Sequence, residues 1–165
     1  AMLDRVADQG IAISIANSGG VRASIDAGDV TMGEVYTVLP FQNTLSTFDV
    51  TGETLIAALE NGVSEYEDVA GRFPQVSGMS YTVDPAAEVG ARISEVKIGG
   101  LAIDMAATYG VVSNNYVRGG GDGYKMFRDA ANAYDFGPDV AEVLADYMAA
   151  QGNYAPYIDG RITVK

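Results

Sequence analysis

Short apolar segments typical of β-strands alternate along this chain with amphipathic segments typical of helices, and no repeat or low-complexity linker separates them. Strands are expected where runs rich in β-branched residues are bounded by turn residues. The segments that meet this description are 11–16, 45–50, 79–84, 92–98, 101–103, 109–113 and 161–164. The pair Gly99-Gly100 predicts a tight turn that makes the strands on either side of it hairpin neighbours.

Helices are expected between these strands. Thr51 is a typical N-cap residue for a helix over 52–63. Apolar residues of that segment share one helical face and are expected to pack in the core: Leu55, Ile56, Leu59 and Val63. Pro138 is expected at the start of a second long helix that ends before Gly152. Two shorter helical segments are expected, over 1–6 and over 29–39.

The mixture of helices with hairpin-like strands predicts an α+β fold, in which a mixed β-sheet is packed with helices, rather than a strictly doubly wound fold. A length of 165 residues with 48% hydrophobic residues is suited to one core, so residues 1–165 are expected to form a single domain. Apolar residues begin at Ala1 without an N-cap before them. We therefore expect polypeptide upstream and a domain that is truncated at its N-terminus.

The chain contains neither histidine nor cysteine. The absence of histidine removes the usual general base at neutral pH and the commonest ligand of transition metals. The absence of cysteine removes disulfides, thiolate nucleophiles and cysteine-based zinc sites. A hydrolase built from these residues alone would depend on carboxylates or lysine, so the composition favours binding over catalysis.

The chain is strongly acidic, with 10 basic and 22 acidic residues and a formal net charge of −12. Such a surface repels phosphate polymers, so no nucleic acid polymer is expected as a partner. A few arginines at one site could still attract a small anion. No segment reaches the roughly 18 apolar residues of a membrane-spanning helix, and no signal peptide is visible.

The segment 114–124 is unusual because it carries four glycines in five residues around one carboxylate, Asp122, with a tyrosine on either side. Glycine accepts positive φ angles and lets another molecule approach the main chain. The expected strand 109–113 leads into this loop, just as the strand 11–16 leads into Asn17 and Arg22. We therefore expect both loops at one end of the sheet.

The polar and aromatic residues of three such loops are candidates for a binding site: Asn17, Arg22, Phe41, Asn43, Tyr116 and Asp122. The two aromatics could hold a flat ring between them, and the two asparagines could bond its edge. The carboxylate could accept hydrogen bonds from a diol, and the guanidinium could meet an anion. Together these properties describe a nucleotide.

Each candidate also has an ordinary interpretation. The aromatics could be partly buried at the rim of the core, the asparagine could belong to a turn, and the arginine could form a surface ion pair. The run Gly-Gly-Gly-Asp-Gly is also similar to calcium-binding glycine-aspartate repeats, but such repeats must stack and only one copy exists here.

Four motifs occur in a defined order: Asn17-Ser-Gly-Gly-Val-Arg22, Leu39-Pro-Phe-Gln-Asn43, Gly71-Arg-Phe-Pro-Gln-Val-Ser-Gly78 and Asn115-Tyr-Val-Arg-Gly-Gly-Gly-Asp-Gly-Tyr124. In this order they resemble the C-terminal domain of the 5'-nucleotidase and UDP-sugar hydrolase family over nearly the whole chain. The resemblance implies a two-domain enzyme. Its N-terminal metallophosphoesterase domain would carry two divalent metal ions and a His-Asp pair, and its C-terminal domain would bind the nucleoside. This chain would be the second domain, without cofactor or activity of its own.

The resemblance also implies a role for each site residue. Phe41 and Tyr116 match the aromatics that enclose the base, and the tyrosine stands where phenylalanine is common. The remaining matches are the asparagines near the base, the arginine near ribose and phosphate, the loop aspartate that binds the ribose hydroxyls, and a glycine where the main chain approaches the base: Asn17, Asn43, Arg22, Asp122 and Gly71.

The expected partners are a nucleoside or nucleotide and the N-terminal domain, which would move relative to this one during the reaction. A periplasmic or extracellular location is implied as well. The alternative is a non-catalytic extracellular binding or scaffold module that has kept the same fold. Metal-binding motifs upstream of Ala1 would distinguish the enzyme from the scaffold.

Overall fold

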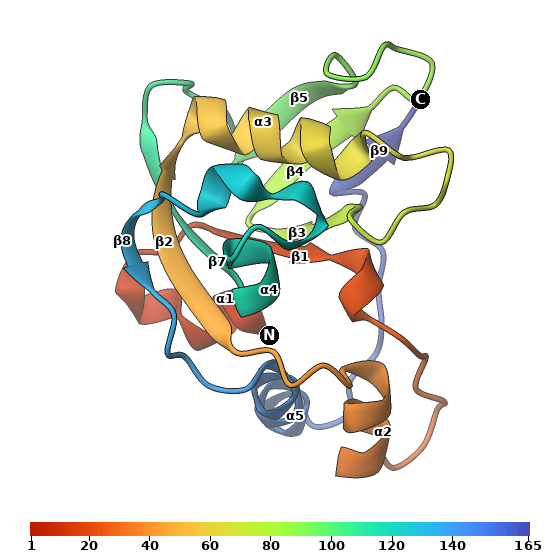
Figure 1. The fold of residues 1–165 in the computed structure, drawn as a ribbon. Helices are drawn as coiled ribbons and strands as arrows, with labels where there is room; N and C mark the ends of the chain where they lie inside the picture. Colours follow the sequence, from red (N-terminus) through yellow and green to blue (C-terminus); the bar gives the residue numbers. More distant parts are fainter.

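Two β-sheets carry the fold of residues 1–165, all of which the computed structural model describes (Figure 1). The five-stranded sheet has the order β3 (Pro74–Ser77), β1 (Ile13–Asn17), β7 (Thr108–Asn114), β2 (Leu45–Thr51) and β8 (Ala131–Tyr134). The four-stranded sheet has the order β6 (Leu101–Ala102), β5 (Ile93–Ile98), β4 (Met79–Val83) and β9 (Ile162–Val164).

Both sheets are mixed. In the first, β1 runs parallel to β7, whereas the other neighbours are antiparallel. In the second, β4 runs parallel to β9 and antiparallel to β5, which forms the expected hairpin with β6. The predicted α+β class with mixed strand directions is therefore confirmed, with the strands divided between two sheets.

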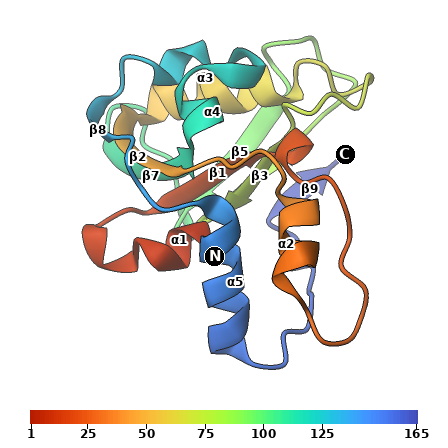
Figure 2. The same cartoon turned by 60° about the horizontal axis from the view of Figure 1, so that its bottom comes forward.

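Five α-helices and four short 3-10 helices connect the strands. The α-helices are α1 (Met2–Arg5), α2 (Met32–Val38), α3 (Gly52–Val63), α4 (Asn115–Arg118) and α5 (Val140–Gln151). The 3-10 helices are η1 (Ala7–Gln9), η2 (Ser18–Gly20), η3 (Gly121–Gly123) and η4 (Lys125–Phe127). Figures 1 and 2 show α3 on one side of the five-stranded sheet and α1 and α5 on the other. None of the helices is both long enough and apolar enough to cross a bilayer.

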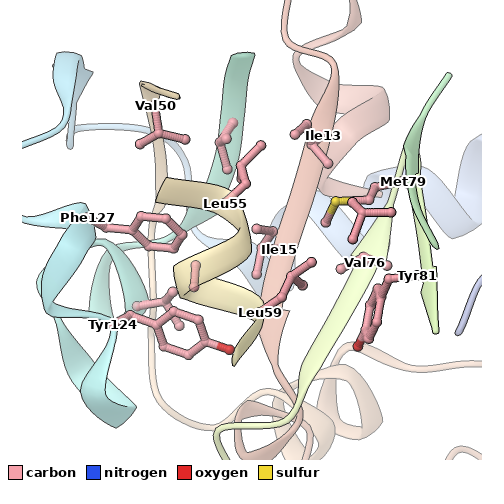
Figure 3. Packing of buried hydrophobic residues seen from close by; sticks show 14 of the residues in the cluster. Ile13, Ile15, Val50, Leu55, Leu59, Val76, Met79, Tyr81, Tyr124 and Phe127 are labelled. Carbon is pink, nitrogen blue, oxygen red and sulfur yellow. The ribbon is translucent and has the colours of Figure 1, made fainter. Parts of the chain in front are cut away.

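The main core lies between α3 and the two sheets. Thr51 caps α3 by accepting a hydrogen bond from the Thr54 amide, as predicted, and the helix has the predicted bounds. Its predicted stripe is buried at Leu55, Leu59 and Val63, whereas Ile56 is only half-buried at its edge. In Figure 3, Leu55 and Leu59 lie on the side of α3 that faces Ile13 and Ile15 of β1, and Phe127 lies on the other side of the helix.

Gly78 joins the two sheets, because it is the single residue between β3 and β4. Its φ is 74°, in the left-handed region, and a Cβ atom there would lie 2.1 Å from the carbonyl oxygen of Ala12. Only glycine therefore fits this crossing without moving the backbone. The buried hydroxyl of Tyr81 donates to the carbonyl oxygen of Pro74 at 2.6 Å and further ties β4 to β3.

Some elements differ from the expectation. The strands β3 and β8 and the helix α4 were not predicted, since β3 begins with a proline and every residue of β8 is exposed. Pro138 does not begin α5. The preceding cap is Asp139, which accepts hydrogen bonds from the amides of Ala141 and Glu142 at 2.7 and 3.3 Å.

Candidate functional site

The parallel pairing of β1 with β7 brings two loops to the same edge of the five-stranded sheet. Ile13 is opposite Val111 and Ser14 is opposite Val112, so the carboxyl ends of both strands point the same way. Asn17 closes β1, and Asn114 closes β7 just before α4 and the glycine-rich loop. As a result, Asn17 Nδ2 donates to Asp122 Oδ2 at 2.7 Å, although 105 residues separate them.

A cavity of about 500 Å³ opens at this edge. Its lining includes all seven residues that the sequence singled out, together with two further glycines: Asn17, Gly19, Gly20, Arg22, Phe41, Asn43, Gly71, Tyr116 and Asp122. The structure thus brings together residues from four separate segments of the chain.

Both aromatic side chains of the cavity are exposed to a degree that core packing does not explain, with exposed fractions of 56% for Phe41 and 47% for Tyr116. Phe41 belongs to the connection between α2 and β2. Three hydrogen bonds fix this connection: Val140 N donates to Asn43 O at 2.8 Å, Thr44 N donates to Asn115 Oδ1 at 3.1 Å, and Asn115 N donates to Thr44 O at 2.9 Å. The backbone of this loop is therefore held in place, while the ring of Phe41 stays exposed at the cavity.

The glycine-rich loop holds Asp122 in a left-handed conformation, with φ 51° and ψ 28°. Asn61 of α3 supports this turn by donating to the carbonyl oxygen of Asp122 at 3.0 Å. Tyr116 donates its hydroxyl hydrogen to Asp122 Oδ1 at 2.8 Å, and this bond raises the pKa of the phenol above its ordinary value. A Cβ atom at Gly121 would lie 2.5 Å from the tyrosine ring, so only glycine leaves room for the ring over the loop.

Two main-chain segments touch beside the cavity at Gly19 and Gly71. The Gly19 amide donates to the carbonyl oxygen of Gly71 at 2.8 Å, and a Cβ atom at Gly19 would lie 2.9 Å from the other Cα. Arg22 follows, with its backbone amide bonded to the Val38 carbonyl and its guanidinium Nη1 donating to Gly19 O at 3.3 Å. The arginine side chain is exposed and stands at the margin of the cavity.

A second, mostly apolar cavity of about 280 Å³ adjoins the first. The two cavities share Asn17, Gly20, Phe41 and Asn43. The remainder of the second cavity is lined by residues of α1, β1, β3 and α5, by Asn114 at the end of β7, and by the loop residues Val21 and Leu39. No group of three or more His, Cys, Asp or Glu side chains is placed to hold a metal ion.

Sequence reasoning missed two supporting residues, Asn61 and Asn114. An asparagine between a strand and a short helix is a typical N-cap, so Asn114 carried a recognisable local signal. Asn61 carried none, because it lies within the predicted helix 52–63 and its partner is 61 residues away.

The chain matches the family model described as the 5'-nucleotidase C-terminal domain over residues 1–129. It is 43% identical over 159 residues to the trifunctional nucleotide phosphoesterase protein YfkN of Bacillus subtilis, covering 93% of this chain and 11% of that protein. The 5'-nucleotidase precursor from Thermus thermophilus superposes with a TM-score of 0.96 at 42% identity, covering 99% of this chain and 33% of that one. The NAD nucleotidase of Haemophilus influenzae superposes with a TM-score of 0.86 at 28% identity, covering 99% and 32%. The chain thus spans from 11% to 33% of these relatives' lengths.

Proposed function

Because the chain belongs to the family of 5'-nucleotidase C-terminal domains, we propose that it is the nucleoside-recognition domain of a two-domain, metal-dependent 5'-nucleotidase. The observation that carries this proposal is the single cavity of about 500 Å³ in which all seven candidate residues meet. Relatives described as nucleotidases and nucleotide phosphoesterases support the same substrate class.

The base binds between the rings of Phe41 and Tyr116. Each ring is about half exposed at the cavity, so each has a free face. Stacking of a base on an aromatic side chain contributes roughly 1–3 kcal/mol and tolerates different bases. The side-chain amides of Asn17 and Asn43 lie on the same cavity and bond the edge of the base, while Gly71 lets the main chain come close.

The ribose binds to Asp122. Each of its carboxylate oxygens already accepts one hydrogen bond, from Tyr116 and from Asn17. A carboxylate offers about four acceptor positions, so two remain for the 2′- and 3′-hydroxyls. The exposed guanidinium of Arg22 attracts the phosphate, which the strongly negative net charge of −12 would otherwise repel.

Hydrolysis belongs to the other domain of the whole enzyme. Two divalent metal ions bound there would supply the chemistry of activating water and stabilising the charge of the transferring phosphoryl group. The present chain supplies positioning, which alone lowers a barrier by fixing the reacting groups in a productive orientation. We propose no catalytic residue and no cofactor in this chain, and we propose that the whole enzyme acts in the periplasm or outside the cell.

Isothermal titration calorimetry of this chain with adenosine tests the proposal. Phe41→Ala removes one stacking face and is expected to weaken binding about 5- to 100-fold. Asp122→Ala removes the diol acceptor and is expected to weaken binding about 10- to 100-fold. Phe136→Ala serves as the control, because this aromatic is 85% exposed and does not line the cavity. The absence of binding by the unchanged chain at millimolar adenosine would contradict the proposal.

A further inference from the structure

Asn114 lines the smaller, adjoining cavity and is connected to Asp122 of the candidate site through Asn17. Its Oδ1 accepts from the backbone amide of Val117 at 2.8 Å, and its Nδ2 donates to Asn17 Oδ1 at 3.0 Å. Asn17 in turn donates to Asp122 Oδ2 at 2.7 Å. Three hydrogen bonds thus connect the N-terminus of α4 with the carboxylate of the glycine-rich loop.

The direction of this chain of hydrogen bonds is determined at both ends. A backbone N–H can only donate, so the side-chain oxygen of Asn114 must face Val117. The NH2 group of Asn114 then faces Asn17 and donates to its side-chain oxygen. The NH2 group of Asn17 must therefore face Asp122. An ionised carboxylate can only accept, so the last bond is satisfied in this orientation and in no other.

Both asparagines are buried, each with an exposed fraction of 5%. Water therefore has little access to replace a lost partner, and an amide in the wrong orientation would leave a buried polar group unpaired. The strand ends are also held rigidly together, because Ser113 donates its hydroxyl to the carbonyl oxygen of Ile15 at 2.6 Å.

We infer that Asn114 is a positioning residue that orients the Asn17 amide toward Asp122 and thereby sets the preference of the site for a ribose with a free cis-diol. This inference rests on the function proposed above. Asn114 does not line the cavity of about 500 Å³ in which the nucleoside is proposed to bind. The Val117 amide fixes the orientation of the Asn114 side chain, which fixes that of Asn17, which in turn donates to the carboxylate of Asp122.

Two substitutions separate this role from helix capping. Asn114→Asp keeps an oxygen for the Val117 amide but offers Asn17 an acceptor instead of a donor, so Asn17 turns its NH2 group away from Asp122. Asn114→Ser also keeps a capping oxygen, adds no charge and is too short to reach Asn17. Asn153→Asp is the control, because it adds the same charge at an exposed position outside the cavity.

The measurement is the ratio of dissociation constants for 2′,3′-dideoxyadenosine and adenosine, obtained by calorimetry on this 165-residue chain. The unchanged chain and Asn153→Asp are expected to bind adenosine about 10-fold or more tightly than the dideoxy compound. Both Asn114 variants are expected to lose most of this ratio while their affinity for the dideoxy compound stays the same. Thermal unfolding reports whether the variants are folded.

Each other outcome has a distinct meaning. If the unchanged chain binds both compounds equally, the proposed role of Asp122 is wrong and the inference falls with it. If the unchanged chain discriminates and the variants discriminate equally well, or lose affinity for both compounds in proportion, only the inference is wrong. Hydrogen exchange of the Asn17 and Asn114 side-chain amides in the unchanged chain requires no variant. Exchange as fast as that of Asn153 would also overturn the inference.

Discussion

At the scale of single residues, the site depends on contacts between side chains and a glycine-rich backbone. Tyr116 lies over Gly121, and its hydroxyl bonds to Asp122, so the ring that is proposed to stack on the base is held by the same loop that carries the proposed ribose acceptor. The geometry of the aromatic wall therefore depends on a residue without a side chain.

Gly121→Ala should weaken adenosine binding about 5-fold or more, because the new Cβ atom would lie 2.5 Å from the Tyr116 ring and push it aside. The ring is half exposed and can move, so the melting temperature should change little. Calorimetry and thermal unfolding measure the two effects. Gly33→Ala is the matched control, since a Cβ atom there meets only Thr31 Oγ1, at 3.7 Å. Unchanged affinity in Gly121→Ala would contradict the role of Tyr116 as a wall of the site.

At the scale of elements, α3 packs against both sheets and also supports the site through Asn61. Leu59→Ala should destabilise the chain by about 2–5 kcal/mol, because this side chain is completely buried and its loss leaves a cavity. Ile56→Ala on the same helix should cost clearly less, since Ile56 is only half-buried. Denaturant unfolding measures both. Equal costs would mean that the helix does not bury the predicted face.

A second prediction concerns the glycine within α3. A Cβ atom at Gly62 would lie 2.6 Å from the Tyr124 hydroxyl and 2.7 Å from the Pro74 ring. Gly62→Ala should therefore destabilise the chain by about 1–3 kcal/mol through overpacking, against the usual helical preference for alanine. At Gly33 of α2 the same substitution makes only an ordinary van der Waals contact with Thr31 and should be stabilising by about 0.5–1 kcal/mol. Urea unfolding midpoints measure the change in stability of both variants, which should have opposite signs. A Gly62→Ala variant that is more stable than the unchanged chain would contradict the close approach of Gly62 to Tyr124 and Pro74.

At the scale of the whole molecule, alkaline pH should unfold the chain through its buried tyrosines. Burial raises the pKa of both Tyr81 and Tyr124 above the ordinary value of 10.0, and the charge of Asp122 adds to the effect on Tyr124. The folded state thus keeps protons that the unfolded state releases. The resulting stability is fully present below pH 10 and is lost as the pH rises toward the folded-state pKa values.

Near-ultraviolet absorbance of tyrosinate measures the ionisation of the tyrosines directly, because the chain has 10 tyrosines and no tryptophan. The buried pair should ionise only in a step that coincides with loss of secondary structure by circular dichroism. Tyr81→Phe should reduce the amplitude of that step. A single smooth titration without unfolding would contradict the burial of these phenols.

Much of the local structure follows from local chemistry. Periodicity and the Thr51 cap predicted α3 at its observed bounds, since a helix depends mainly on residues within a few positions of each other. The same reasoning predicted the strands that alternate or carry β-branched runs. It failed for β8, whose exposed residues Ala131–Tyr134 are a strand only because β2 offers a free edge to pair with.

The candidate site likewise has a part that local sequence patterns predict and a part that depends on contacts between distant segments. Local sequence patterns indicate which residues are candidates for nucleoside binding, because their motifs can be read in order along the chain. The tertiary structure is needed to show that these residues share one cavity, that the strands form two sheets, and that the NH2 group of Asn17 faces Asp122. That last feature depends on partners 97 and 105 residues away, which come within hydrogen-bonding distance only when β1 and β7 pair.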